Sequence, residues 1–111
     1  MPSAPLFSPT PDKRPIEETW VRYQTHPTED LRNALKEHYL WLVAYTAGRL
    51  KRIFPGVALE DLMRVGIFGL LDAIDDFDTG RGMNFETYGA PRIRGAILNE
   101  LRSRDADGTG R

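Results

Sequence analysis

The chain lacks cysteine, long apolar runs and any large surplus of charge, and each absence narrows what it can be. With no cysteine among 111 residues, it forms no disulfide, binds no metal through thiolates and has no cysteine nucleophile. No apolar stretch approaches the roughly 20 residues that cross a bilayer. The opening MPSAPLFSPTPDKRP has no basic segment followed by an apolar core, as a secretory signal would. We therefore expect an intracellular, cytoplasmic protein without membrane contact.

The net charge of −1 argues against a protein that binds polyanions through its overall charge. The charges are nevertheless segregated along the chain. Between residues 59 and 78 lie six acids and one base, and the acids are Glu60, Asp61, Asp72, Asp75, Asp76 and Asp78. Between residues 92 and 104 lie one acid and four arginines, which are Arg92, Arg94, Arg102 and Arg104. This pattern predicts a domain with an acidic face and a basic face.

Motifs of catalysis and metal binding are also missing. The chain has no P-loop, no GxGxxG and no GxSxG, and neither His26 nor His38 belongs to a catalytic pattern. The clustered aspartates lack the D-x-D-x-D-G loop of an oxygen-ligand cation site. We therefore predict no catalytic residue, no metal and no cofactor, and expect a binding protein rather than an enzyme.

Apolar periodicity predicts a small all-α helical bundle made of one domain. Helices are expected at about 16–24, 29–53, 59–76 and 85–103, within a folded domain of residues 16–104. Residues 1–15 contain five prolines without periodicity, so they should form a disordered tail. Residues 105–111 should form a second disordered tail, with the character of a loop.

Glycine and proline predict two further details. Gly66 and Gly69 each cost a helix about 1 kcal/mol relative to alanine, so their presence in an apolar helix predicts close approach by another helix. Pro91 removes a backbone donor, so the last helix should bend there or begin late.

Aromatic side chains precede the arginine-bearing helix. Phe77 and Phe85 are expected mainly in the core, whereas Tyr88 has small neighbours and is followed at i+4 by Arg92. A tyrosine ring beside arginines can stack an unpaired base, which contributes about 1–3 kcal/mol per base. The arginines could form an ordinary solvated face or contact phosphate and guanine through paired donors. The acidic residues could likewise be a solvated helix end or a surface for docking another protein.

Several runs, taken together, resemble region 2 of a bacterial RNA polymerase sigma factor. The closest similarity is to the flagellar and sporulation branch, the sigma-28-like group of the sigma-70 family. The runs are Glu60-Asp61-Leu62, residues 66–74, Phe77-Asp78, Phe85-Glu86-Thr87-Tyr88, residues 92–96 and Glu100-Leu101-Arg102. The resemblance covers residues 17–105 and implies a fold of packed helices.

The resemblance also implies two macromolecular contacts and leaves an anti-sigma factor as a possible third partner. The helix at 59–76 would dock on the clamp coiled coil of the largest core RNA polymerase subunit through its acids: Glu60, Asp61, Asp72, Asp75, Asp76 and Asp78. The segment 80–91 would capture bases of the single-stranded non-template −10 promoter strand with Phe85, Glu86, Thr87 and Tyr88. The following helix would meet the upstream edge of that element with Arg92, Arg94 and Arg102.

Two departures from the family pattern leave the function open between two readings. Gly89 stands where the family usually has alanine, which should loosen the helix start beside Tyr88. Beyond Asp105 the family's usual continuation, and the domains that read the rest of the promoter, are missing from this sequence. The chain is therefore expected to be either a promoter-melting region 2 domain or a truncated module that binds polymerase or an anti-sigma factor without initiating transcription.

Overall fold

The computed structural model describes residues 15–109, which fold into five α-helices joined by short turns. They are α1 (Ile16–Thr25), α2 (Glu29–His38), α3 (Leu40–Ile53), α4 (Leu59–Asp76) and α5 (Phe85–Thr109), with a 3₁₀ helix at Thr79–Arg81. This part of the chain contains no strand, and the predicted all-α bundle is confirmed. The predicted N-terminal tail, apart from its last residue, and residues 110–111 lie outside the described residues.

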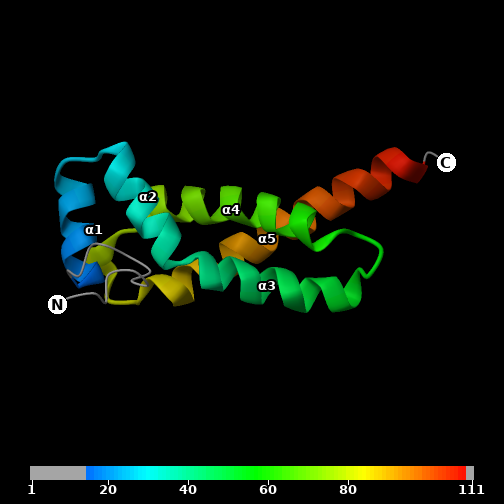
Figure 1. The fold of residues 1–111 in the computed structure, drawn as a ribbon, viewed down its shortest axis with the longest axis horizontal. Coiled ribbons are helices and arrows are strands. Elements are labelled where there is room, and N and C mark those ends of the chain that lie inside the picture. The colour runs from blue at the N-terminus through cyan, green and yellow to red at the C-terminus, as the bar shows by residue number, and fades with distance from the viewer. Residues whose placement is uncertain (1–14, 110–111) are drawn as a thin grey trace, which may run out of the picture.

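Three long helices, α3, α4 and α5, run lengthwise and pack on one another, while α1 and α2 lie at one end (Figure 1). The C-terminal part of α5 projects beyond the end of α4 (Figure 1). The largest fully buried side chains are Leu35, Val43, Leu70, Ile74, Ile93 and Ile97. Each contributes about 1.5–3 kcal/mol by leaving water, so the apolar stripes of α2 to α5 form one core.

Two glycines in α4 allow the close helix packing that the sequence predicted. A Cβ on Gly69 would lie 2.8 Å from the Cβ of Ala96 and 3.2 Å from the carbonyl oxygen of Arg92. A Cβ on Gly66 would lie 2.9 Å from a methyl group of Val43. Gly69 therefore brings α4 against α5, and Gly66 brings it against α3.

The helix predicted at 29–53 is divided into α2 and α3 at Tyr39. The backbone of Tyr39 has φ −103° and ψ 11°, outside the α-helical region. Its ring centroid lies 4.4 Å from that of Phe85, and its hydroxyl accepts a hydrogen bond of 3.0 Å from Nε1 of Trp20. The prediction was wrong here because contacts with distant aromatic residues determine the break, and no glycine or proline marks it locally.

The other predicted boundaries of the second and third helices agree closely with the structure. The hydroxyl of Thr28 accepts the backbone N–H of Leu31 at 3.1 Å and caps α2. α3 ends at Ile53, just before the Pro55-Gly56 stop. The Lys51 ammonium group then donates to the backbone carbonyls of Pro55 and Val57, at 2.8 and 2.7 Å, and closes the turn into α4.

The last helix begins where predicted and ends later. α5 starts at Phe85 and contains Pro91, so proline does not delay its start. Because proline has no N–H, the carbonyl of Thr87 lacks its helical donor. The helix continues to Thr109, which corrects the expectation of a loop from residue 105.

Candidate functional site

The turn between α4 and α5 has a defined shape set by short polar contacts. The Asp78 carboxylate accepts the backbone N–H of Gly80 at 2.9 Å. Gly82 then adopts φ +84°, a conformation that side chains disfavour. Asn84 caps α5 by accepting the backbone N–H and the hydroxyl of Thr87, at 3.0 and 2.8 Å. These contacts fix where α5 starts and commit the Thr87 hydroxyl to the cap.

Helix α1 holds this turn from the side. Gln24 donates from Nε2 to the carbonyl of Phe77 at 2.9 Å and accepts the hydroxyl of Thr79, also at 2.9 Å. The Tyr23 hydroxyl donates to Asp75 at 2.7 Å. Residues of α1 more than 50 positions earlier therefore hold the end of α4 and the turn that follows it. No local pattern in the sequence predicts these contacts.

The aromatic residues before the arginines form a buried cluster. Phe85 is only 3% exposed and lies 4.4 Å from Tyr39 and 5.3 Å from both Trp20 and Phe77, measured between ring centroids. This confirms the expectation that Phe85 belongs to the core, and its contact with a base stays a prediction. The Phe85 ring also covers Gly89, where an added Cβ would lie 2.9 Å from it. The glycine that was expected to loosen the helix thus makes room for this ring.

Tyr88 is half-buried beside this cluster. Its ring lies 5.3 Å from that of Phe77, between centroids. The guanidinium of Arg92 lies at the hydroxyl end of the ring, with its carbon 5.0 Å from the ring centroid, and donates from Nη1 to the tyrosine hydroxyl at 2.7 Å. Nη2 of Arg92 forms an ion pair of 2.7 Å with Asp76.

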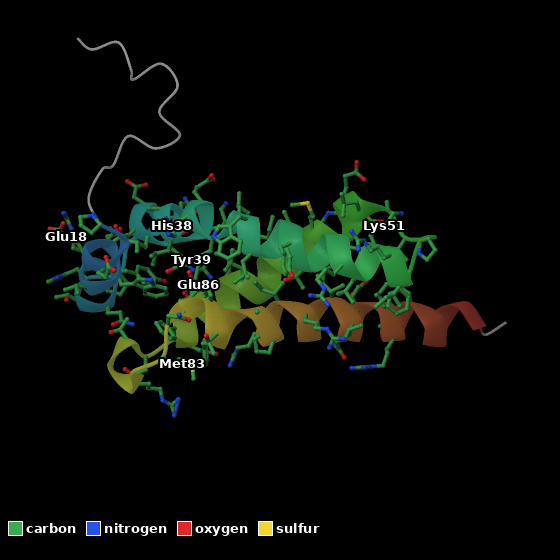
Figure 2. The ribbon with its side chains drawn as sticks, turned by 90° about the horizontal axis from the view of Figure 1, so that it is seen from below. Glu18, His38, Tyr39, Lys51, Met83 and Glu86 are labelled. Atoms are coloured by element: carbon green, nitrogen blue, oxygen red, sulfur yellow. The ribbon has the colours of Figure 1, made fainter. Side chains whose placement is uncertain are left out.

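Glu86 is half-buried on the other side of the start of α5. It lines a cleft of about 460 Å³ with Trp20, His38 and Tyr39, and Figure 2 shows Glu86 near Tyr39 and His38. Burial raises the pKa of the Tyr39 hydroxyl, and the Glu86 carboxylate adds to this rise, whereas the hydrogen bond from Trp20 opposes it. The Tyr39 side chain is therefore a neutral hydrogen-bond acceptor in this cleft.

The predicted arginines lie on two different flanks of α5. Arg92 and Arg102 line a cleft of about 480 Å³ on the α4 side, together with Asp72 and Asn99. Arg94 lines a groove on the α3 side instead. The cause is helical geometry, because residues 92 and 94 are about 200° apart around the axis.

The α3 groove is a basic surface that the sequence reasoning missed. It has a volume of about 890 Å³, and Arg94 shares it with Tyr45, Arg49 and Arg52, while none of the described acidic residues lines it. Tyr45 is 59% exposed, and the guanidinium of Arg49 lies 5.7 Å from its ring centroid. The i, i+4 spacing of Tyr45 and Arg49 repeats that of Tyr88 and Arg92. This repeated spacing is the signal in the sequence that could have indicated the groove.

Most of the predicted docking acids have partners within the chain. Asp75 accepts two hydrogen bonds from Arg32, at 3.0 and 2.8 Å, and these bonds are the main cause that lowers the pKa of its carboxyl group. Asp76 pairs with Arg92, and Asp78 caps the turn. Asp61 bonds Arg64 at 3.0 Å. Only Glu60 and Asp72 of the predicted set have no hydrogen bond or ion pair to the described residues.

An exposed aromatic residue occupies the middle of the outward face of α4. Phe68 is 63% exposed, and Arg64 and Asp72 lie one turn before and one turn after it. Leu59, at the start of the helix, is also exposed. An exposed ring among charged residues is typical of a protein-docking surface.

Two other kinds of feature were sought in the part of the chain that the structure describes. No three side chains of His, Cys, Asp or Glu among the described side chains of residues 15–104 are placed to hold a metal ion together. None of the described helices is long and apolar enough to span a membrane.

Comparison with known proteins decides the family. The sequence matches the Sigma-70 region 2 family over residues 35–106. The chain belongs to that family. It is 39% identical over 87 residues to the RNA polymerase sigma-D factor of Bacillus subtilis, which covers 78% of this chain and 34% of that protein. It is 47% identical over 75 residues to the sigma factor FliA of Yersinia enterocolitica, which covers 67% of this chain and 33% of that protein.

These relatives place the chain in the sigma-28-like branch, as the motifs suggested. Sigma factor FliA of Pseudomonas aeruginosa is similar too, with 40% identity over 84 residues, 75% of this chain and 34% of that protein. The chain thus spans about a third of the length of the curated relatives that it matches.

Proposed function

We propose that this region 2 domain docks on core RNA polymerase and captures unpaired bases of the non-template −10 strand. The observation that carries this proposal is the position of Tyr88, backed by buried Phe77 and adjoined by Arg92 at the ordered start of α5. Melting is then driven by trapping the open strand, and the chain performs no chemistry. This role belongs in the bacterial cytoplasm.

We assign the bases of the strand to the start of α5 and its phosphates to the groove between α3 and α5. Extruding a base costs a few kcal/mol, and stacking on an aromatic ring offsets about 1–3 kcal/mol of this cost. Arg94, Arg49 and Arg52 line the α3 groove without an acidic neighbour among its lining residues, so this groove favours the phosphate backbone. Arg102, in the cleft on the α4 side, is assigned to the upstream edge of the −10 element.

The polymerase contact is assigned to the outward face of α4. Phe68 supplies the apolar anchor, while Glu60 and Asp72 supply carboxylates for basic groups of the partner. The proposal differs from the sequence expectation in emphasis, because Asp75, Asp76 and Asp78 stabilise the domain itself.

The DNA half of the proposal is tested with a fluorescent single-stranded −10 oligonucleotide and bacterial core polymerase. Tyr88→Ala and Arg94→Ala should each weaken oligonucleotide capture by the complex about fivefold to 100-fold, as loss of a stacked base or a phosphate contact does. Arg22→Ala, at an exposed arginine of α1, is the matched control. Polymerase binding with no oligonucleotide capture would instead support the alternative, an interaction module for polymerase or an anti-sigma factor.

The polymerase half is tested by measuring the affinity of the chain for core polymerase without DNA. Phe68→Ala should weaken binding about 30-fold, the usual effect of removing a central aromatic anchor. Val21→Ala, an equally exposed apolar residue on α1, is the control. Unchanged affinity of the Phe68 variant would refute docking through this face.

A further inference from the structure

A second exposed tyrosine lines the α3 groove, apart from the aromatic cluster around Phe85. Tyr45 is 59% exposed, and the ring pairs found among the described residues do not include it. Arg49 donates from Nη1 to the Tyr45 hydroxyl at 3.1 Å, and its guanidinium carbon lies 5.7 Å from the ring centroid. Together these distances place the guanidinium beyond the hydroxyl, so the exposed face of the ring stays free.

Small residues line the groove beside this ring. They are Ala44 and Gly48 of α3 and Ala90 of α5. A Cβ added to Gly48 would meet nothing within 4 Å. The groove therefore has room for a planar group next to Tyr45.

Three guanidinium groups line the same groove. They belong to Arg49, Arg52 and Arg94, and none of the described acidic residues lines it with them. A base can stack on an exposed aromatic ring while arginines bind its phosphate. The groove thus offers complementary groups to both halves of a nucleotide.

We propose that Tyr45 is a second base-stacking ring, so that the α3 groove binds a whole nucleotide of a single strand and not its phosphate alone. This inference rests on the proposed function for its occupant, the single strand. Tyr88 lies beside Arg92 on the α4 flank of α5, whereas Tyr45 faces the other flank. The two rings therefore hold different nucleotides.

The test uses the full chain without polymerase, at low ionic strength, and two fluorescein-labelled probes with equal numbers of phosphates. One probe is decathymidylate and the other is a decamer of abasic units. Tyr45→Ala should weaken binding of decathymidylate about fivefold, the lower end of the effect of losing a stacked base, and leave the affinity for the abasic probe unchanged. Tyr45→Phe should bind decathymidylate as the original chain does, because stacking requires the ring and not the hydroxyl. Arg49→Ala should weaken both probes by the same factor, since it removes a phosphate contact.

Trp41→Ala is the matched control. Trp41 is 52% exposed and lies one turn before Tyr45 on the same helix, but it does not line the groove. Its removal should leave both affinities unchanged. A loss equal to that of Tyr45→Ala would refute the assignment of the base to the groove.

The other outcomes separate the second ring from the proposed function. Equal weakening of both probes by Tyr45→Ala, or a Tyr45→Phe chain as weak as Tyr45→Ala, would show that the residue only holds Arg49 and would overturn the inference. Unchanged binding of both probes by Tyr45→Ala would overturn it too, as would an original chain that binds neither probe, and a loss of polymerase affinity would then identify a protein-docking groove. If Tyr88→Ala weakens decathymidylate binding while Tyr45→Ala does not, the proposed function stands and the second ring is refuted. If Tyr45→Ala alone weakens it, the groove binds a base and the proposed function fails at Tyr88.

Discussion

The two flanks of α5 carry arginines in opposite electrostatic settings. On the α4 flank, Arg92 is paired with Asp76, and Asp72 lines the same cleft. On the α3 flank, Arg94 shares a groove with Arg49 and Arg52, and none of the described acidic residues lines it. One flank has its charges largely compensated within the chain, and the other does not.

This difference separates two uses of the same residue type. An arginine paired across two helices has its charge partly offset by its partner, so it attracts a further anion less strongly. Arginines without acidic neighbours create a positive potential that attracts an anion from solution. Under the proposed function, the α3 flank is therefore the one suited to hold the backbone of the strand.

The largest effect is expected from a substitution that forces α4 and α5 apart. Gly69→Ala places a Cβ against Ala96 and the Arg92 carbonyl, and backbone cannot yield as a flexible side chain can. We expect the free energy of unfolding to fall by about 1–3 kcal/mol, even though alanine favours a helix. Urea denaturation followed by circular dichroism measures this change.

Gly48→Ala is the matched control on the α3 flank. A Cβ at Gly48 would meet nothing within 4 Å, so the substitution should raise stability by up to about 1 kcal/mol through helix propensity. Equal effects of the two substitutions would contradict the close approach at Gly69.

Most of the fold could be predicted from the sequence because local patterns indicate most of its helices. The periodic apolar residues, the Thr28 cap and the Pro55-Gly56 stop determine helices with little help from distant contacts. The glycine pair in α4 even predicted close packing on that helix. Tyr39 was missed because its helix break depends on Trp20 and Phe85, which lie far away in the chain.

The candidate site was less predictable, because charge counts do not tell which charges pair. Asp75 and Arg32 are 43 residues apart and form a bidentate ion pair that no spacing rule connects. Phe68 has the sequence character of a core residue, and only the orientation of α4 shows that it faces outward. The sequence indicates which residue types matter, whereas the residues that each of them contacts depend on tertiary packing.

A smaller effect is expected on the salt dependence of DNA binding, which should differ between the arginines of the two flanks. Each phosphate contact on a single strand contributes about 0.7 to the slope of log affinity against log salt. Arg94→Ala and Arg49→Ala should each reduce the slope by about this amount. Arg92→Ala should reduce it less, because Asp76 already offsets its charge.

The measurement is anisotropy of a labelled single-stranded oligonucleotide over a range of salt concentrations, with Arg22→Ala as the control for net charge. A larger slope change for Arg92 than for Arg94 would reverse the assignment of the phosphates to the α3 flank.

The smallest effect is expected from removing the charge of Asp75. It tests whether ion pairs offset the acidic charges of α4 beyond the flank that faces α5. Asp75 is paired with Arg32 of α2, and its carboxyl pKa lies below the usual value, mainly because of the hydrogen bonds from Arg32. The folded state therefore binds fewer protons at this group than the unfolded state. Its contribution is fully present above the ordinary aspartate pKa of about 3.9 and is lost as the pH falls through the lowered folded value.

Asp75→Asn should accordingly lower the free energy of unfolding by at most about 1 kcal/mol at pH 7, since the pair is partly exposed. The difference from the original chain should shrink at an acidic pH below the lowered folded-state pKa of Asp75, where the carboxyl group of the original chain is also protonated. Urea denaturation at both pH values measures it, with Asp72→Asn as the control on the same helix. A deficit that is independent of pH would mean that Asp75 acts through packing or its bond with Tyr23, and that charge compensation in α4 is confined to the flank facing α5.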